Sequence, residues 1–350
     1  MPTSNRKIVI TKFSKDPTVV ALITEALPDP QPTECTVKIL YSGFSGSDIN
    51  MRMGNYPMQK KAPLGTGYCF VGRVDKLGSD VIDVKQGALV ACLTKYDSEA
   101  TYANQPARYL MPVPESLADK LEEVVTLVLD WTTAYGMIDR SAKVKKGDKV
   151  FIHGLSGAVG YATMQLCLLR GAEVYGTANT SKHAELEKYG VRPFTYTNKD
   201  WIKQIHKIGG VHAVFDPLGP ESWEESWQIL SMNDPSRLVG YGSNAQNLTD
   251  DGKEHVGSGS LSSAFATLWP TTRLLMKNAC MSPRHTSFFY VDRDQKTFVP
   301  DFQTLLELLE QGKLDIKIKQ KVKLEGVQDL HRNWTSVKGI GSCVVEIDGW

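Results

Sequence analysis

The feature that most constrains this chain is a turn of three regularly spaced glycines between an apolar run and a helix-like segment. Val150-Phe151-Ile152-His153 is followed by Gly154, Gly157 and Gly160. A side chain at such positions would block the close approach of a phosphate, or of the helix to the strand. A strand, a tight turn and a helix N-terminus in this order are typical of a pyrophosphate site built from backbone N–H groups. The turn therefore favours a nucleotide-dependent enzyme over the alternative, a glycine turn used only for packing.

The composition is that of an ordinary globular protein. The 350 residues are 41% hydrophobic and 23% charged, and the net charge is +1. This length favours two domains, and the balanced charge indicates no nucleic-acid partner. No apolar stretch approaches the roughly 20 residues of a transmembrane helix. The six cysteines are scattered without a CxxC pair, which predicts reduced thiols in a cytoplasmic protein.

Two kinds of pattern divide the chain. Residues 1–115 contain strand-like runs broken by glycine, proline and aspartate turns, which predicts a mixed or barrel-like β domain. From residue 149 onward strands alternate with helices, which predicts a parallel, doubly wound α/β sheet. A helical stretch at 117–138 bridges the two patterns, and a final strand at 343–347 returns to the first domain. The expected domain limits are 125–282 for the nucleotide-binding domain, and 1–124 with 283–350 for the β-rich one.

The same periodicity predicts the elements of the second half. A helix is expected at 157–170, with Val159, Ala162, Leu166 and Leu169 on one buried face. The other expected elements are strands at 149–153, 173–177, 213–216 and 237–242, an edge strand at about 287–291, and helices at 183–189 and 302–311.

The end of the second parallel strand distinguishes between the two nicotinamide dinucleotides. NAD sites usually place a carboxylate there, about 20 residues after the turn, to bind the ribose hydroxyls. Here the stretch 177–183 reads Thr-Ala-Asn-Thr-Ser-Lys-His and contains none. Thr180 and Lys182 instead suit a 2′-phosphate, because a hydroxyl and an ammonium both donate to phosphate oxygens. The sequence therefore favours NADPH; the alternative is that Lys182 is an ordinary solvated helix residue.

In their order along the chain, the motifs resemble those of the medium-chain dehydrogenase/reductase superfamily. The landmarks are 43–56, 65–72, 129–135, the glycine turn, 216–219, 238–242 and 338–345. Within the superfamily, the chain looks most like the zinc-free branch of quinone oxidoreductases, enoyl reductases and vesicle amine transport protein-like members. This resemblance implies a GroES-like catalytic domain with an inserted Rossmann domain, and a site in the cleft between them.

The resemblance also implies which residues contact NADPH. The glycine turn would hold the pyrophosphate, Lys182 and Tyr196 the 2′-phosphate, and the C-terminal segment would close the pyrophosphate side. Thr133 would approach the nicotinamide. The implied cofactor residues are Ser45, Ser156, Gly157, Ala158, Val159, Thr180, Lys182, Tyr196, Tyr241, Gly242, Lys338 and Gly341.

The same motifs imply that no metal is bound. Zinc alcohol dehydrogenases carry a cysteine and a His-Glu pair at positions that hold Ser45, Tyr68 and Cys69 here. A catalytic zinc needs three protein ligands and an open position, and Cys69 alone cannot supply them.

The working hypothesis for the chemistry is hydride transfer from NADPH to the electrophilic carbon of a conjugated carbonyl compound. Tyr56 or Asn50 would donate a hydrogen bond to the enolate oxygen, although Tyr56 could equally be a core aromatic residue with a satisfied hydroxyl. The chain departs from quinone reductases at Asn50, where the first of two tyrosines is common, and at Pro217, where some relatives have a serine. The alternatives are a quinone oxidoreductase and a non-catalytic NADPH-binding protein of the vesicle amine transport type.

The expected partner is a small, largely apolar substrate. Methionine and aromatic residues could line its pocket, although such clusters are more often plain core. These candidates are Met51, Met53, Met58, Phe265, Trp269, Phe288, Phe289 and Tyr290. The resemblance further suggests a homodimer along the edge of the Rossmann sheet, where Pro283 could limit strand pairing.

Overall fold

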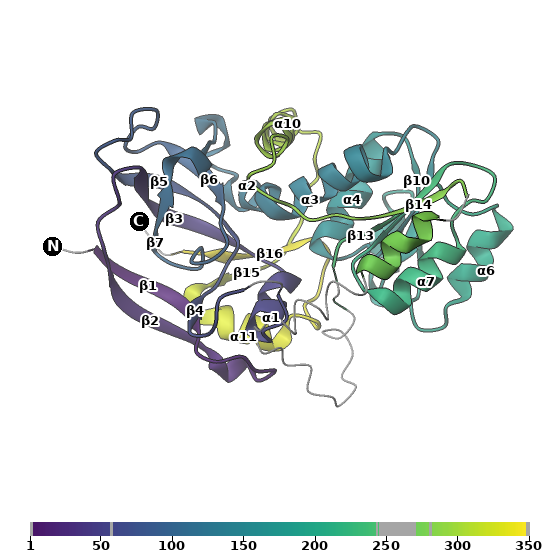
Figure 1. The fold of residues 1–350 in the computed structure, drawn as a ribbon, viewed down its shortest axis with the longest axis horizontal. Coiled ribbons are helices and arrows are strands. Elements are labelled where there is room, and N and C mark those ends of the chain that lie inside the picture. The colour runs from purple at the N-terminus through teal and green to yellow at the C-terminus, as the bar shows by residue number, and fades with distance from the viewer. Residues whose placement is uncertain (1–2, 57–58, 243, 245–270, 280–281, 348–350) are drawn as a thin grey trace.

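The computed structural model of the chain contains two sheet systems joined by a helical bridge (Figure 1). It describes residues 3–56, 59–242, 244, 271–279 and 282–347. The first system combines a seven-stranded sheet, in which β15-β16-β3-β5-β6-β8 are neighbours and β7 pairs with β3, with a three-stranded sheet of order β2-β1-β4. The strands are β1 (Thr3–Ile10), β2 (Val20–Leu27), β3 (Glu34–Phe44), β4 (Leu64–Gly65), β5 (Cys69–Leu77), β6 (Leu89–Leu93), β7 (Tyr102–Pro106), β8 (Met111–Pro112), β15 (Ile318–Lys323) and β16 (Ser342–Glu346).

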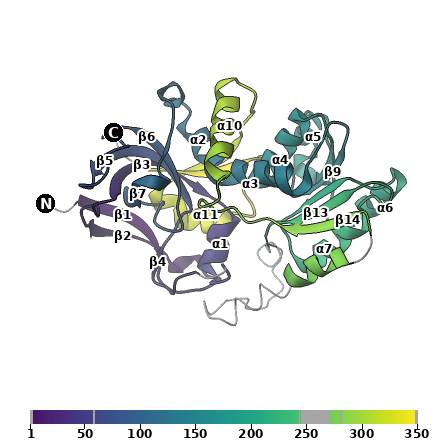
Figure 2. The ribbon, with the colours of Figure 1, turned by 45° about the horizontal axis from the view of Figure 1, so that its top comes forward.

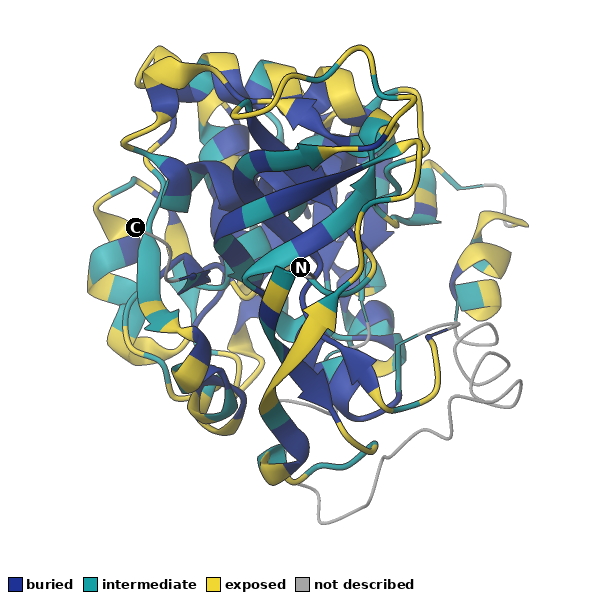
Figure 3. Cartoon of the chain, turned by 90° about the vertical axis from the view of Figure 1, so that its left-hand side faces the viewer, coloured by how far each residue is buried: buried dark blue, intermediate teal, exposed yellow. Residues whose placement is uncertain are grey.

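A shared apolar core holds these two sheets together. Ile10, Val37 and Val345, each from a different strand, are fully buried in it. Figure 3 shows these central strands covered by more exposed segments. The predicted β-rich domain is thus confirmed, and its fold is the GroES-like one that the resemblance implies.

The second system is a six-stranded parallel sheet with the order β11-β10-β9-β12-β13-β14 (Figure 2). Numbered along the chain, these strands run 3-2-1-4-5-6, the order of a Rossmann fold. The order reverses between β9 and β12, which makes the carboxyl ends of these strands the switch point at which such sheets bind ligands. The strands are β9 (Lys149–His153), β10 (Glu173–Thr177), β11 (Arg192–Phe194), β12 (Ala213–Asp216), β13 (Ser236–Gly240) and β14 (Arg284–Phe288).

Helices cover the parallel sheet and connect it to the GroES-like domain. Among the described residues, no helix combines the length and the apolar character that a membrane span requires. The helices are α1 (Gly46–Arg52), α2 (Leu121–Thr126), α3 (Thr132–Gly136), α4 (Ala158–Leu169), α5 (His183–Glu187), α6 (Asp200–Lys207), α7 (Pro220–Gln228), α10 (Phe298–Glu310) and α11 (Val327–Asn333), with π-helical stretches η4 (Leu127–Trp131) and η5 (Met137–Ala142). Short 3-10 turns are η1 (Pro17–Val19), η2 (Ala107–Tyr109), η3 (Glu115–Leu117), η6 (Thr180–Lys182), η7 (Lys277–Ala279) and η8 (Leu324–Gly326).

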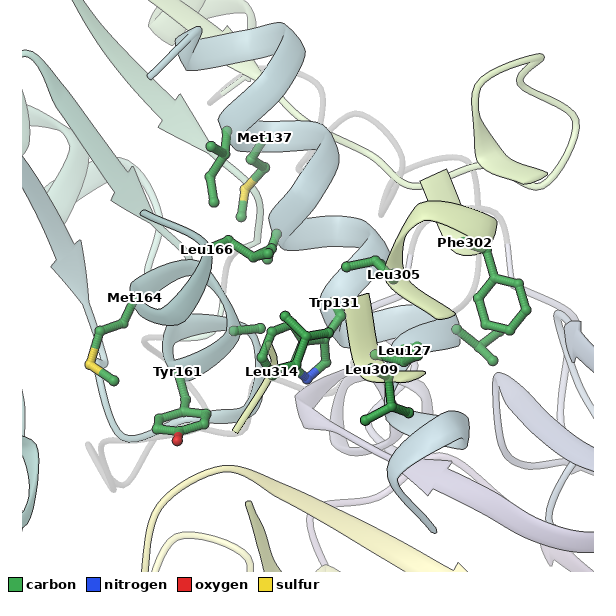
Figure 4. Packing of buried hydrophobic residues seen from close by; sticks show 14 of the residues in the cluster. Leu127, Trp131, Met137, Tyr161, Met164, Leu166, Phe302, Leu305, Leu309 and Leu314 are labelled. Atoms are coloured by element: carbon green, nitrogen blue, oxygen red, sulfur yellow. The ribbon is translucent and has the colours of Figure 1, made fainter. Parts of the chain in front are cut away.

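The helical bridge 121–142 runs through one continuous hydrophobic core. Trp131 is 1% exposed and lies between Tyr161 of α4 and Leu309 of α10 (Figure 4). The same core includes Val71 of β5 and Val150 of β9, so it extends from the GroES-like sheet to the parallel sheet. Apolar burial on this scale is the main force that holds the two sheets in one arrangement.

The last strand returns to the GroES-like domain, as the sequence predicts. β16 pairs antiparallel with β3, placing Val344 opposite Gly43, and it pairs in parallel with β15. The Ser342 hydroxyl at the start of β16 donates a 2.8 Å hydrogen bond to Asp130 in the bridge. The predicted domain limits at residues 125 and 282 stay a prediction, because the bridge packs against both sheets.

Several expected elements differ from the structure. The strand expected at 237–242 is β13 (Ser236–Gly240), and the helix expected at 183–189 ends at Glu187. The helix at 157–170 has no single buried face: α4 is covered on several sides, whereas Leu169 is 49% exposed. The helix expected from residue 302 begins at Phe298, and the edge strand expected at about 287–291 is β14, at Arg284–Phe288. In each case packing against distant parts of the chain decides the outcome, and a local pattern does not contain that information. β14 does form a sheet edge, and the homodimer along it stays a prediction.

A chain of buried hydrogen bonds locks the carboxyl ends of β9, β10 and β12. The Gly154 N–H donates to the Thr177 hydroxyl, which lies 3.3 Å from His153 Nδ1. The opposite nitrogen, His153 Nε2, is 3.0 Å from the Ser226 hydroxyl, which donates to Asp216 Oδ2. Burial lowers the pKa of His153, so the ring is neutral and can carry its proton on Nε2. Each hydrogen bond from the Gly154 N–H to the Asp216 carboxylate then has one donor and one acceptor.

Replacing Asp216 should destabilise the protein. Its carboxylate is fully buried and accepts hydrogen bonds from the Leu218 N–H and from the Ser222 and Ser226 hydroxyls. Because D216A removes the acceptor of all three donors, of which the Ser226 hydroxyl is fully buried, we expect a loss of about 3 kcal/mol of unfolding free energy. Urea denaturation of D216A measures this loss, with the exposed Asp83→Ala as control. Equal midpoints for the two variants would contradict this reading of the network.

Candidate active site

The glycine turn lies at the switch point of the parallel sheet. Gly154 follows β9 with a φ of +75°, a left-handed conformation that favours glycine. A Cβ at Gly160 would overlap the Gly154 carbonyl oxygen, so this glycine allows α4 to pack against the turn. Gly157 is the N-cap of α4 and offers no capping side chain to the first turn of the helix. The N–H groups of Ala158 and Val159 in that turn could therefore donate to a pyrophosphate.

Lys182 is held where the second strand ends. Its Nζ donates to the carbonyl oxygens of Val337 at 3.2 Å and Gly339 at 2.5 Å. Burial and the neighbouring Lys319 lower the pKa of Lys182. Thr180 in η6 is exposed, and Tyr196 is also on the surface. The structure thus brings Lys182 to the C-terminal segment. Thr180 and Tyr196, which are exposed, belong to the same region of the sequence as Lys182.

The C-terminal segment also contacts the glycine turn. The Gly341 N–H donates a 3.1 Å hydrogen bond to the Ser156 carbonyl oxygen. Lys338 is exposed in the same segment. Ser156, Lys182 and Gly341, which were predicted separately from three parts of the sequence, therefore lie in one hydrogen-bonded group. This group could hold the phosphates of a dinucleotide.

The segment that directly follows β13 contributes Tyr241 and Gly242. The Tyr241 N–H donates to the Asp216 carbonyl oxygen at 3.2 Å, and burial raises the pKa of the Tyr241 hydroxyl. A Cβ at Gly242 would lie 2.9 Å from the Pro217 carbonyl oxygen, which explains why this position is glycine. Thr133 is buried in α3, within the bridge, and Tyr241 packs against the core formed around that bridge.

The two catalytic candidates of the GroES-like domain each contact the parallel-sheet domain. Asn50 in α1 donates through Nδ2 to Asn244 Oδ1 at 2.8 Å. The Tyr56 hydroxyl lies 3.0 Å from the hydroxyl of Tyr290. The Tyr56 ring packs against Tyr68 with 5.2 Å between ring centroids. Burial, followed by Tyr290, raises the pKa of Tyr56, so its hydroxyl stays protonated.

The positions that hold zinc ligands in related dehydrogenases make structural contacts here. Ser45 caps α1 by accepting from the Ser47 N–H, while Asp48 Oδ2 accepts from the Ser45 N–H. The Tyr68 hydroxyl donates to the Ser47 carbonyl oxygen, and the buried Cys69 thiol donates to a backbone carbonyl. Burial raises the pKa of Cys69 well above its usual range, which disfavours the thiolate that binds metals. The part of the chain that the structure describes contains no group of three metal-ligating side chains.

Sequence reasoning missed two residues of this site. Asn244 received no role, and Tyr290 was considered only for an apolar wall. Both follow the carboxyl ends of parallel strands, β13 and β14, and that position was the available signal. Of the other wall candidates, Met51 and Met53 are buried in the core of the GroES-like domain, and Phe288 and Phe289 are partly buried against cores of the parallel-sheet domain. Met58, Phe265 and Trp269 lie outside the described residues.

Comparisons with known proteins agree with this architecture. The model of the alcohol dehydrogenase GroES-like domain matches residues 31–115, and the zinc-binding dehydrogenase model matches residues 158–277. The synaptic vesicle membrane protein VAT-1 homolog of Rattus norvegicus is 28% identical over 97% of this chain and 83% of its own length. The quinone oxidoreductase of Escherichia coli, solved with NADPH, has a TM-score of 0.79 at 20% identity over 97% of this chain and 99% of its own. The CurK enoyl reductase has a TM-score of 0.76 at 20% identity over 98% of this chain and 99% of its own.

The fold and the two matched domain models define an oxidoreductase of a class that combines a GroES-like with a Rossmann domain and binds nicotinamide cofactors. The two matched domain models follow each other along the chain in the same order as the motifs of the superfamily. The chain belongs to the medium-chain dehydrogenase/reductase superfamily, in the zinc-free branch that includes quinone oxidoreductases, enoyl reductases and VAT-1 proteins.

Asp130 should make the stability of the protein fall as the pH rises. Burial raises the pKa of this carboxyl to about 6, and one of its oxygens has no hydrogen-bond partner. Since the folded protein retains a proton that the unfolded chain releases near pH 4, stability is lost between about pH 4 and pH 6. D130N should remove up to about 3 kcal/mol of this loss. Urea denaturation at several pH values measures it; parallel profiles for D130N and wild type would contradict the assignment.

Proposed function

We propose that this protein is an NADPH-dependent reductase that transfers hydride to the conjugated C=C bond of an enone, enal or enoyl substrate. The observation that carries the proposal is the placement of Tyr56. Its hydroxyl is kept protonated by burial, and it lies where α1 meets the segment after β14. A neutral phenol in such a position can donate a hydrogen bond, and then a proton, to an enolate.

The residues at the switch point fit NADPH. The uncapped first turn of α4 suits the pyrophosphate, because its N–H groups and the helix dipole both favour an anion. Lys182 suits the 2′-phosphate, with Thr180 and Tyr196 as further donors. No carboxylate lies in the stretch 177–183 to repel that phosphate or to bind the ribose hydroxyls in its place. On binding, Lys182 would exchange its two backbone carbonyl partners for phosphate oxygens.

In the proposed reaction, bound NADPH supplies the hydride, and the chain supplies orientation and a proton. Tyr241, Gly242 and Thr133 would hold the nicotinamide face of the site, and Lys338 and Gly341 would close its phosphate side. Asn50, which contacts Asn244, would donate a hydrogen bond through its side-chain amide to the carbonyl oxygen of the substrate. Tyr56 would then donate its proton to the enolate. Ser45 would support this arrangement through the cap that holds α1.

Quinone reduction is the second candidate. It is supported by the fold shared with a quinone oxidoreductase solved with NADPH, and by the neighbouring aromatic rings of Tyr56 and Tyr68, which are tilted by 47° to each other and offer aromatic surface to a flat ring system. The deciding assay follows oxidation of NADPH by absorbance, with an enone and a quinone in parallel and with NADH as control. Enone-dependent oxidation is the expected result. Consumption with the quinone alone would favour the second candidate, and binding of NADPH without turnover would contradict both.

Removing the Lys182 ammonium should weaken NADPH selectively. A charge-assisted hydrogen bond to phosphate contributes about 1.5–3 kcal/mol, so K182A should raise the Kd for NADPH by about 10- to 100-fold. The Kd for NADH should change much less, because NADH has no 2′-phosphate. Nicotinamide fluorescence titration measures both constants, with the exposed Lys188→Ala as matched control. An equal loss for NADH and NADPH would show that Lys182 only holds the C-terminal segment.

Removing the Tyr56 hydroxyl should slow the reduction itself. Y56F keeps the ring that packs on Tyr68, so the GroES-like domain should fold as before. Loss of a proton donor typically lowers turnover by about 100-fold or more. We therefore expect a fall of that size in kcat for the enone, with an unchanged Kd for NADPH. Unchanged turnover in steady-state kinetics would mean that Tyr56 is only a packed aromatic residue.

A further inference from the structure

The Tyr56 hydroxyl has its partner on the other domain. Tyr290 follows β14 by two residues and lies 234 positions further along the chain, yet the two hydroxyl oxygens are 3.0 Å apart. Either oxygen can be the donor in this pair. The contact therefore joins a residue after α1 to the carboxyl end of the parallel sheet.

The two members of the pair differ in their access to solvent. Tyr56 is partly buried, with its ring against Tyr68 and its backbone N–H bound to Gln59 Oε1 at 2.8 Å. Tyr290, in contrast, is 53% exposed. The hydrogen bond between them thus connects a partly buried tyrosine to one that is more open to water.

Contacts on both sides fix Tyr290 in this position. The preceding Phe289 N–H donates to the Gly240 carbonyl oxygen at 2.8 Å, which ties the segment to β13. Three residues further on, Arg293 donates to the Leu93 carbonyl oxygen at 3.0 Å, which ties it to β6. The backbone of this segment is therefore attached to both domains, which places the phenol of Tyr290 beside Tyr56.

A buried phenol that gives away its proton must recover it for the next turnover. Burial strongly raises the pKa of Tyr56, so its phenolate would be unstable in this position. The hydroxyl of Tyr290 lies within hydrogen-bond distance of it. We propose that Tyr290 is a positioning residue for proton delivery, which holds the Tyr56 hydroxyl and passes it a proton from solvent. This inference rests on the proposed reduction of a conjugated C=C bond.

The proton and electron balance of the step is simple. The hydride of NADPH brings two electrons to the β-carbon, and the Tyr56 O–H bond breaks as a proton joins the enolate at its α-carbon. The Tyr290 O–H bond then breaks as a proton returns to the Tyr56 oxygen. A water molecule at the exposed side of Tyr290 gives up the replacement proton, so each turnover takes one proton from the solvent.

The test is the variant Y290F, which keeps the ring and removes only the hydroxyl. We expect kcat for the enone to fall by about 10-fold, with little change in KM or in the Kd for NADPH. The solvent isotope effect on kcat should rise and the effect of deuterated NADPH should fall, because proton delivery becomes the slow step. Tyr102→Phe, on β7 of the GroES-like domain, is the matched control and should behave as wild type.

A double variant distinguishes a relay from two independent contributions. If Tyr290 acts only through Tyr56, Y56F/Y290F should be no slower than Y56F alone. Unchanged kinetics in Y290F would overturn the inference, and so would a lower kcat with both isotope effects at their wild-type values, which would indicate a structural role. A wild-type protein that reduces no enone would instead overturn the proposed function, and the relay with it.

Discussion

The site depends first on the hydrophobic core that runs through the helical bridge 121–142. Each sheet could be stable by itself, but the chemistry needs residues from both. Trp131 and its neighbours bury apolar surface against α4 and α10, and the same core reaches Val71 and Val150 of the two sheets. Because protein interiors are close-packed, this shared core stabilises the arrangement of the domains that the structure shows. That arrangement brings α1 to the ends of β13 and β14, where Asn50 meets Asn244 and Tyr56 meets Tyr290.

Burial also sets the protonation states at the switch point. His153 is neutral, and the hydroxyls of Tyr56 and Tyr241 stay protonated, because each of their charged forms would lie in a poorly solvated position. The chain thus presents neutral donors near the proposed nicotinamide position, and holds the Lys182 ammonium on two backbone carbonyl oxygens of the C-terminal segment. A dinucleotide phosphate and a neutral conjugated substrate would need this division of charge.

Local sequence patterns predicted the parallel strands well. β9, β10 and β12 have the predicted bounds, because each is a short apolar run between turn residues. The glycine turn was predictable because its geometry excludes side chains. Which faces of α4 are buried could not be predicted from its sequence, because this depends on the bridge and α10, which pack against it in the same core. The pairing of Asn50 with Asn244 and of Tyr56 with Tyr290 was not predicted either, because the partners are 194 and 234 residues apart and local patterns do not specify such contacts. Only the position of Asn244 and Tyr290 after β13 and β14 pointed to the site.

The most direct test of the account follows the hydride itself. The wild-type protein is incubated with an enone and with NADPH that carries deuterium at the transferred position, and the product is analysed by nuclear magnetic resonance. The account predicts a saturated ketone with deuterium on the carbon β to the carbonyl group and a solvent hydrogen on the α-carbon. An allylic alcohol with deuterium on the carbinol carbon, or recovery of unchanged enone, would contradict it.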